Sequence, residues 1–145
     1  MSLLSPSDQQ TLRDALTALA RPVTILFFTQ TIDCETCDET RQILGELTAV
    51  SDRVRVEEVN LVLERDRAAQ YGIDRAPGLV LLAGEELADT RMRFLGAPAG
   101  YDFMSLVDAL LLAGGASPQV LSDASVARLA EVSEPLSLQV FVTPT

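Results

Sequence analysis

The sequence predicts an α/β domain built on a central, mixed sheet of four strands with helices on its faces. Residues 23–28 and 78–83 form two runs without charged side chains, as is typical of strands that are buried on both faces of a sheet. Apolar residues at helical spacing come before, between and after these runs. This alternation of strands and helices indicates a sheet that helices cover.

Each predicted element has a local signal. Ser5 and Pro6 form an N-cap followed by proline in the first helical turn, Gly72 is a left-handed cap that ends a helix, and Gly84 begins a turn. The predicted elements, in order, are a helix over 6–19, a strand over 23–29, a helix over 34–50, a strand over 54–59, a helix over 63–71, antiparallel strands over 78–83 and 90–95, and a last helix that begins near Phe103 and ends at Gly114.

Composition and net charge limit the classes of function that the chain can have. A chain of 145 residues with 48% hydrophobic residues has enough apolar material for a packed core. Its net charge of −10, from 21 acidic and 11 basic residues, argues against binding to nucleic acid or to an anionic membrane. No apolar stretch approaches the roughly 18 residues of a membrane span. The first residues do not read as a signal peptide, so we expect a cytoplasmic location.

The cysteine pair is the feature with the clearest chemistry. Cys34 and Cys37 are the only cysteines, and they follow the predicted strand 23–29 closely. A thiolate at a helix start faces open N–H groups and the positive end of the helix dipole, and a second thiol one turn later can close a disulfide. Cys37 lies seven residues before Leu44 and shares its inward face, whereas Cys34 is open to solvent. The spacing favours thiol–disulfide exchange over a structural crosslink, because the closed loop is minimal.

The cysteine pair is also compatible with two roles other than thiol–disulfide exchange. The thiols could be inert parts of a binding or dimerisation module, or two chains could share a metal or an iron–sulfur cluster through their paired cysteines. Within one molecule, the sequence has no histidine and no further cysteine, so neither a Cys–His nucleophile nor a four-ligand zinc site can be assembled. We therefore expect no cofactor.

Several segments carry a family resemblance. A strand that leads into Cys-x-x-Cys at a helix start, followed by Tyr-Gly-Ile-Asp-Arg-Ala-Pro at 71–77, resembles the thioredoxin superfamily. Residues 93–103 and 140–145 are similar, more specifically, to the glutaredoxin-like protein disulfide oxidoreductases, whose chains carry two thioredoxin-fold units. The resemblance implies a thioredoxin-like fold and exchange with protein or glutathione disulfides. It also implies a reductase or glutathione as electron donor.

The resemblance implies a role for each candidate site residue. Cys34 attacks a substrate disulfide, and Cys37 then releases the substrate by closing the Cys34–Cys37 disulfide. Pro77 is expected to be cis and to shape the substrate groove without donating a hydrogen bond, since it has no N–H. Ala76 would offer backbone groups to an extended substrate. Arg75 would either supply positive charge or be a solvated loop arginine, and the solvated arginine is the simpler interpretation.

Acidic residues surround the predicted reactive thiol. Between the cysteines this chain has Glu35-Thr36, whereas glutaredoxins commonly have Pro-Tyr and thioredoxins Gly-Pro. The acidic residues are Asp33, Glu35, Asp38 and Glu39. Because negative charge disfavours a thiolate, we predict that the pKa of Cys34 is less depressed than in strongly oxidising relatives. The Cys34–Cys37 pair should then be biased toward the reducing end of the range.

Beyond Gly115 the pattern of the chain start recurs. Residues 122–142 repeat the order of helix, proline and apolar strand found in 7–31. We therefore predict a thioredoxin/glutaredoxin-like domain over 1–115 and, in 116–145, a linker, a helix and the first strand of a second unit that is cut short. We expect the strand over 136–142 to dock on a sheet edge or on a second copy of the chain, which would give a homodimer.

Overall fold

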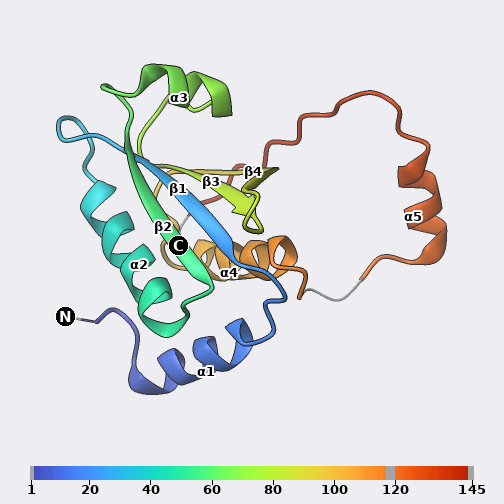
Figure 1. Ribbon diagram of the computed structural model, residues 1–145, viewed down its shortest axis with the longest axis horizontal. Helices are drawn as coiled ribbons and strands as arrows, with labels where there is room; N and C mark the ends of the chain where they lie inside the picture. The colour runs from blue at the N-terminus through green and yellow to red at the C-terminus, as the bar shows by residue number, and fades with distance from the viewer. Residues whose placement is uncertain (1, 117–119, 144–145) are drawn as a thin grey trace.

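The computed structural model describes residues 2–116 and 120–143. Within these ranges, none of the helices has the length and apolar character needed to cross a membrane. The predicted order of elements is confirmed (Figure 1). The elements are α1 (Pro6–Leu16), β1 (Val23–Thr29), α2 (Cys37–Val50), β2 (Val54–Asn60), α3 (Arg65–Tyr71), β3 (Gly78–Ala83), β4 (Ala88–Leu95), α4 (Asp102–Ala113) and α5 (Asp123–Ala130).

The sheet is mixed, as predicted, and its strand order is β2-β1-β3-β4. β1 pairs in parallel with β2 and antiparallel with β3, and β4 pairs antiparallel with β3 on the far edge. The two central strands, β1 and β3, are buried at every position, whereas the edge strands β2 and β4 include exposed residues. The uninterrupted apolar runs of β1 and β3 therefore reflect their central places in the sheet.

Helices cover both faces of the sheet. On one face, α1, α2 and α4 pack on alternate residues of the central strands around Ile25, Phe27 and Leu81. On the other face, α3 and the segment after it pack on the intervening residues, which include Phe28 and Val80. The odd and even positions of β1 thus point into two separate apolar clusters, which is the side-chain period of a strand with two covered faces.

Four connecting segments meet at one end of the sheet. β1 and β2 end side by side, because Thr29 is in register with Asn60, and β3 begins opposite the end of β1. β4 ends at the same place, where Leu95 is in register with Gly78. The backbone N–H of Leu61 donates to the carbonyl oxygen of Thr29 at 2.9 Å, which ties the first two segments together. The cysteines lie in this group of loops.

Besides the start of α2, two helix boundaries differ from the sequence prediction. α1 ends at Leu16, before the predicted residue 19, because the hydroxyl of Thr17 donates to the carbonyl oxygen of Asp14 at 2.6 Å and the chain then turns toward α4. α3 begins at Arg65, after the predicted residue 63. There the side-chain oxygen of Asn60 accepts the backbone N–H groups of residues 62 and 63, which holds these residues in a turn.

In the segment after α4, the predicted helix is present and the predicted strand is not. α5 forms where a helix was predicted, and its N-cap Ser122 accepts the backbone N–H of Ser125. None of its residues is buried, and Figure 1 draws it away from the sheet. The predicted strand over 136–142 is wrong, since these residues form no strand and are fully exposed. A strand needs a hydrogen-bonding neighbour, and the described residues offer this segment none.

Candidate active site

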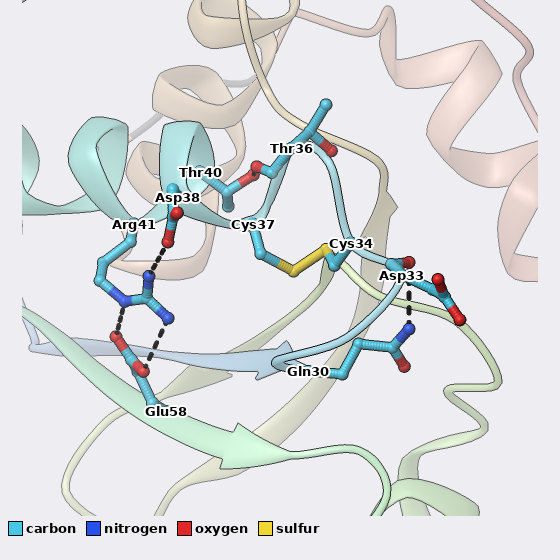
Figure 2. Close-up of a disulfide and its surroundings, with 9 residues drawn as sticks. All are labelled: Gln30, Asp33, Cys34, Thr36, Cys37, Asp38, Thr40, Arg41 and Glu58. Atoms are coloured by element: carbon cyan, nitrogen blue, oxygen red, sulfur yellow. Dashed lines mark hydrogen bonds and ion pairs between the residues drawn. A yellow bond between two sulfur atoms is a disulfide. The ribbon is translucent and has the colours of Figure 1, made fainter.

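The two cysteines are joined by a disulfide at the start of α2 (Figure 2), with Cα atoms 5.5 Å apart. Cys37 is the first residue of the helix and is only 3% exposed, and it belongs to the apolar cluster between α2 and the sheet. Cys34 is half-buried and lies in the loop before the helix. The inward position predicted for Cys37 is therefore confirmed, and Cys34 is the sulfur nearer to solvent.

The helix itself begins later than predicted. Cys34 was expected to start it, but α2 begins at Cys37 with Thr36 as the N-cap residue. The Thr36 side chain makes no hydrogen bond to the first turn, so it leaves the N–H groups there open. The buried hydroxyl of Thr40 instead donates to the carbonyl oxygen of Thr36 at 2.8 Å, which holds the end of the loop on the helix.

The loop that carries Cys34 is closed by a short local contact. Gln30 donates from its side chain to the carbonyl oxygen of Asp33 at 3.2 Å, as Figure 2 shows. Asp33 has φ 57°, a left-handed conformation that aspartate tolerates better than most residues. This turn lies directly before Cys34.

The acidic residues predicted around the thiol lie there, but one cation lies among them. Arg41, on the second turn of α2, binds Asp38 of the first turn and also Glu58 of β2, the latter through two hydrogen bonds of 2.7 and 3.3 Å. Its guanidinium also lies 5.8 Å from the centre of the Phe27 ring. Hydrogen bonding to Glu58 raises the pKa of Arg41, so this charge is permanent.

Arg41 and Glu58 were not among the residues predicted from the sequence. The spacing of four residues between Cys37 and Arg41 places both on one helix face, and this signal was available in the sequence. The contribution of Glu58 could not be found in the same way, since it depends on how α2 packs beside β2.

The segment before β3 carries the other candidate residues. The bond between Ala76 and Pro77 is cis, as the family resemblance implied. Ala76 and Cys34 are both half-buried, and both pack against the apolar cluster that includes Cys37. Arg75 pairs with its neighbour Asp74 at 2.9 Å, with 65% of its side chain exposed, which is the arrangement of a solvated loop arginine.

Sequence comparisons and structural comparisons differ in what they find. No family model and no curated protein sequence matches the chain. Among solved structures, an N-terminal domain of the alkyl hydroperoxide reductase AhpF from Enterococcus faecalis superimposes with a TM-score of 0.74 at 27% identity. The match covers 83% of this chain and 57% of that one, so this chain spans little more than half of the AhpF chain.

Two further solved structures show the same fold. A protein disulfide oxidoreductase from Aeropyrum pernix matches with a TM-score of 0.71 and 24% identity over 88% of this chain and 54% of that one. A thioredoxin mutant from Halobacterium salinarum matches with a TM-score of 0.51 and 19% identity over 75% of this chain and 88% of that one. With the geometry above, these similarities confirm the resemblance seen in the sequence: the chain has the thioredoxin fold and carries a Cys34–Cys37 disulfide at the start of its α2 helix.

Proposed function

We propose that the chain is a thiol–disulfide oxidoreductase whose reacting groups are Cys34 and Cys37. In the forward direction the Cys34 thiolate attacks a substrate disulfide, forms a mixed disulfide and expels one substrate thiolate. Cys37 then attacks the sulfur of Cys34, the Cys34–Cys37 disulfide forms, and the second substrate thiolate leaves. Two electrons and two protons pass from the dithiol to the substrate, which is reduced to two thiols.

The observation that carries this proposal is that the two cysteines of the disulfide differ in their exposure to solvent. Cys34 is the more exposed, so an incoming thiol or disulfide reaches it first. Cys37 is buried beside it and can react only with Cys34. The open N–H groups of the first turn of α2 stabilise a thiolate at this place. An attacking residue and a protected resolving residue are the two parts that the reaction needs.

The substrate side of the proposed site is the segment that ends in the cis peptide bond. Ala76 would offer backbone groups to an extended polypeptide, and Pro77 would present a surface without an N–H donor. The contact of Ala76 with the cluster around Cys37 supports this placement. Arg75 is assigned only a minor part, since its charge is already paired with Asp74.

The partners proposed follow from the same chemistry. The substrates would be protein disulfides, and a reductase or glutathione would return electrons to the pair. The compartment proposed is a reducing cytoplasm, where a close cysteine pair such as Cys34 and Cys37 is used for chemistry more often than for crosslinking. Whether the pair behaves like that of a glutaredoxin or a thioredoxin would show in its preference for glutathione or for the reductase.

A redox titration tests the proposal. Protein is equilibrated in glutathione buffers of defined potential, its thiols are alkylated, and the mass shift gives the reduced fraction. We expect reversible two-electron exchange with a midpoint between about −180 and −300 mV. In a parallel assay Cys37→Ser should accumulate a mixed disulfide, and Cys34→Ser should form none. A pair that never opens or never closes would contradict the proposal and leave a redox-inert binding or dimerisation module.

We also propose that 1–115 is the thioredoxin-fold domain and that 116–145 contains a linker, a helix and the segment that corresponds to the first strand of a second, similar unit. The two helix starts support this division, since Ser5 and Ser122 are N-caps of nearly equal geometry, with φ −66° and −65°. Each accepts the backbone N–H of the third residue after it.

The exposed tail is the basis for a proposed homodimer. Leu138, Val140 and Phe141 are 89%, 84% and 89% exposed, and an apolar segment without a neighbour is prone to pair with a sheet edge. Pairing with a second copy would bury it. Sedimentation should then show a dimer for the whole chain and a monomer for a chain that ends at Ala116. A monomer in both cases would contradict the proposed dimer.

A further inference from the structure

Arg41 is the only basic residue in the whole stretch from 31 to 50, which contains both cysteines. It joins the first turn of α2 to the edge strand β2, because it binds Asp38 and Glu58 at once. The three side chains are arranged so that the guanidinium lies between two carboxylates, and Figure 2 shows this group on the Cys37 side of the disulfide.

Helix geometry explains why Arg41 acts near the sulfurs. Residues four apart on a helix have Cβ atoms about 5–6 Å apart, so Arg41 and Cys37 are neighbours on α2. Side chains of a helix also lean toward its N-terminus, which directs Arg41 back over the turn that holds Cys37. The contact of its guanidinium with the ring of Phe27, which belongs to the same cluster as Cys37, agrees with this direction.

The charges around the cysteine pair come from four segments of the chain. The loop and α2 supply acids and one base, β2 supplies an acid, and the segment before β3 supplies an acid and a base that pair with each other. These groups are Asp33, Glu35, Asp38, Glu39, Arg41, Glu58, Asp74 and Arg75. Without Arg41, the α2 and β2 groups would be acidic throughout, and such an environment opposes a thiolate.

We infer that Arg41 is a positioning residue that sets how readily the cysteine pair forms its thiolate, because it offsets the charges of Asp38 and Glu58. This inference rests on the proposed exchange reaction and deepens it. Arg41 matters in the steps where a cysteine carries negative charge. These are the attack of Cys34 on a substrate disulfide, the attack of Cys37 on the sulfur of Cys34, and the release of Cys37 and then of Cys34 as thiolates when the pair is reduced again. Arg41 donates no proton in either step.

Two substitutions break the same ion pair but change the net charge in opposite directions. They therefore distinguish an effect of charge on the thiol pKa from an effect of the ion pair on structure. Arg41→Met removes the positive charge and leaves the carboxylates uncompensated, so the pKa of the reactive thiol should rise and alkylation of reduced protein at pH 7 should slow roughly threefold to tenfold. Glu58→Gln removes a negative charge and leaves Arg41 in place, so alkylation should become faster. If the ion pair only held α2 on β2, both substitutions would change the rate in the same direction.

The chain offers a matched control at the other end of the same strand. Arg55 of β2 binds Glu85 through two hydrogen bonds of 2.8 Å and is exposed to a similar extent, 48% against 45% for Arg41. Arg55→Met should leave the thiol pKa unchanged. Arg41→Lys, which keeps the charge and loses the fork of two hydrogen bonds, should restore most of the alkylation rate lost in Arg41→Met.

The measurement is the rate of alkylation of reduced protein between about pH 5 and pH 10, with circular dichroism as a check that each variant is folded. Opposite shifts for Arg41→Met and Glu58→Gln, with no shift for Arg55→Met, are the expected result. Equal or absent shifts would overturn the inference even if the protein still exchanges disulfides. Conversely, a pair with the expected shifts that exchanges with no disulfide would contradict the proposed function and not the role of Arg41 in setting the thiol pKa.

Discussion

At the scale of single residues, the ion pair between Arg93 and Asp89 of β4 is the least exposed one in the described part of the chain. Arg93 donates two hydrogen bonds of 2.8 Å to the Asp89 carboxylate and a third, of 3.0 Å, to the carbonyl oxygen of Tyr71. These bonds from Arg93 hold the pKa of Asp89 below its ordinary value, and the backbone N–H of Arg91 adds to the effect. The pair ties the edge strand to the end of α3.

The pH dependence of this pair follows from the direction of the shift. The folded protein binds a proton at Asp89 less readily than the unfolded chain, so the stabilisation is present above about pH 4 and is lost as the pH falls through the lower folded value. We predict that Asp89→Asn lowers the free energy of unfolding by about 0.5 kcal/mol at pH 7, since the pair is partly exposed. Urea unfolding should show this difference vanishing near pH 2, while Glu134→Gln in the exposed tail should have no effect at either pH.

The residue scale also shows which site features the sequence could reveal. The Cys34–Cys37 pair was expected from a local motif and the cis bond before Pro77 from the family resemblance. The structure has both the disulfide and the cis bond, although Cys34 lies before the helix rather than at its start. The pairing of Arg41 with Glu58 was not expected, because the packing of α2 beside β2 brings the two residues together. Local chemistry can be predicted from a motif, whereas charge pairs between elements require the fold.

At the scale of elements, two glycines have opposite surroundings. Gly45 lies in the exposed interior of α2, and a Cβ added there would meet nothing within 4 Å. Gly78 begins β3 directly after Pro77, and a Cβ there would come within 2.9 Å of the Ile73 side chain and 3.0 Å of the Arg75 carbonyl oxygen. The backbone atom cannot retreat without moving the segment before β3.

These two glycines give a paired prediction. Gly45→Ala should raise the free energy of unfolding by about 0.5–1 kcal/mol, because alanine has a higher helix propensity and loses less conformational entropy. Gly78→Ala should lower it by about 1–3 kcal/mol, the usual cost of overpacking. Chemical unfolding of both variants is the measurement. If Gly78→Ala were as stable as Gly45→Ala, the close packing of this segment against Ile73 would be wrong.

The elements differ in how well the sequence defined their ends. The bounds of β1 and β3 were predicted to the residue, because strands buried on both faces contain no charged side chain until they leave the sheet. The ends of α1, α2 and α3 were each misplaced by two or three residues. The Thr17 hydroxyl donates a hydrogen bond where α1 stops, and the Asn60 side-chain oxygen accepts two before α3 starts. Such bonds compete with helical ones.

At the scale of the whole molecule, the described part of the segment after Ala116 adds nothing to the core. α5 has no buried residue, and residues 131–143 are exposed throughout. Ala116 itself packs against the core and donates to the carbonyl oxygen of Leu111. We predict that a chain ending at Ala116 keeps its melting temperature within about 2 °C at concentrations where both forms are monomers. A drop of about 10 °C in a thermal scan would mean that the removed segment stabilises the domain.

The whole-molecule arrangement was only partly predictable. The mixed sheet and the helices on its faces followed from the order of apolar patterns, and the structure confirms them. The strand over 136–142 was predicted from its β-prone composition alone. The prediction is wrong, because a strand forms only where its backbone can hydrogen-bond to a neighbouring strand. The strand order β2-β1-β3-β4 depends on contacts between distant segments, and no local pattern encodes it.

The turn between β3 and β4 lies at the end of the sheet opposite the cysteines. Ala83 and Ala88 face each other across it, and Ala83 is in register with Val23 at the start of β1, whereas the cysteine loop follows the end of β1. Residues 85–87 of this turn are exposed. A fluorescent protein or a surface anchor inserted there would be held a full strand length from the sulfurs. The molecule could thus be labelled or immobilised while its reactive end faces the solution.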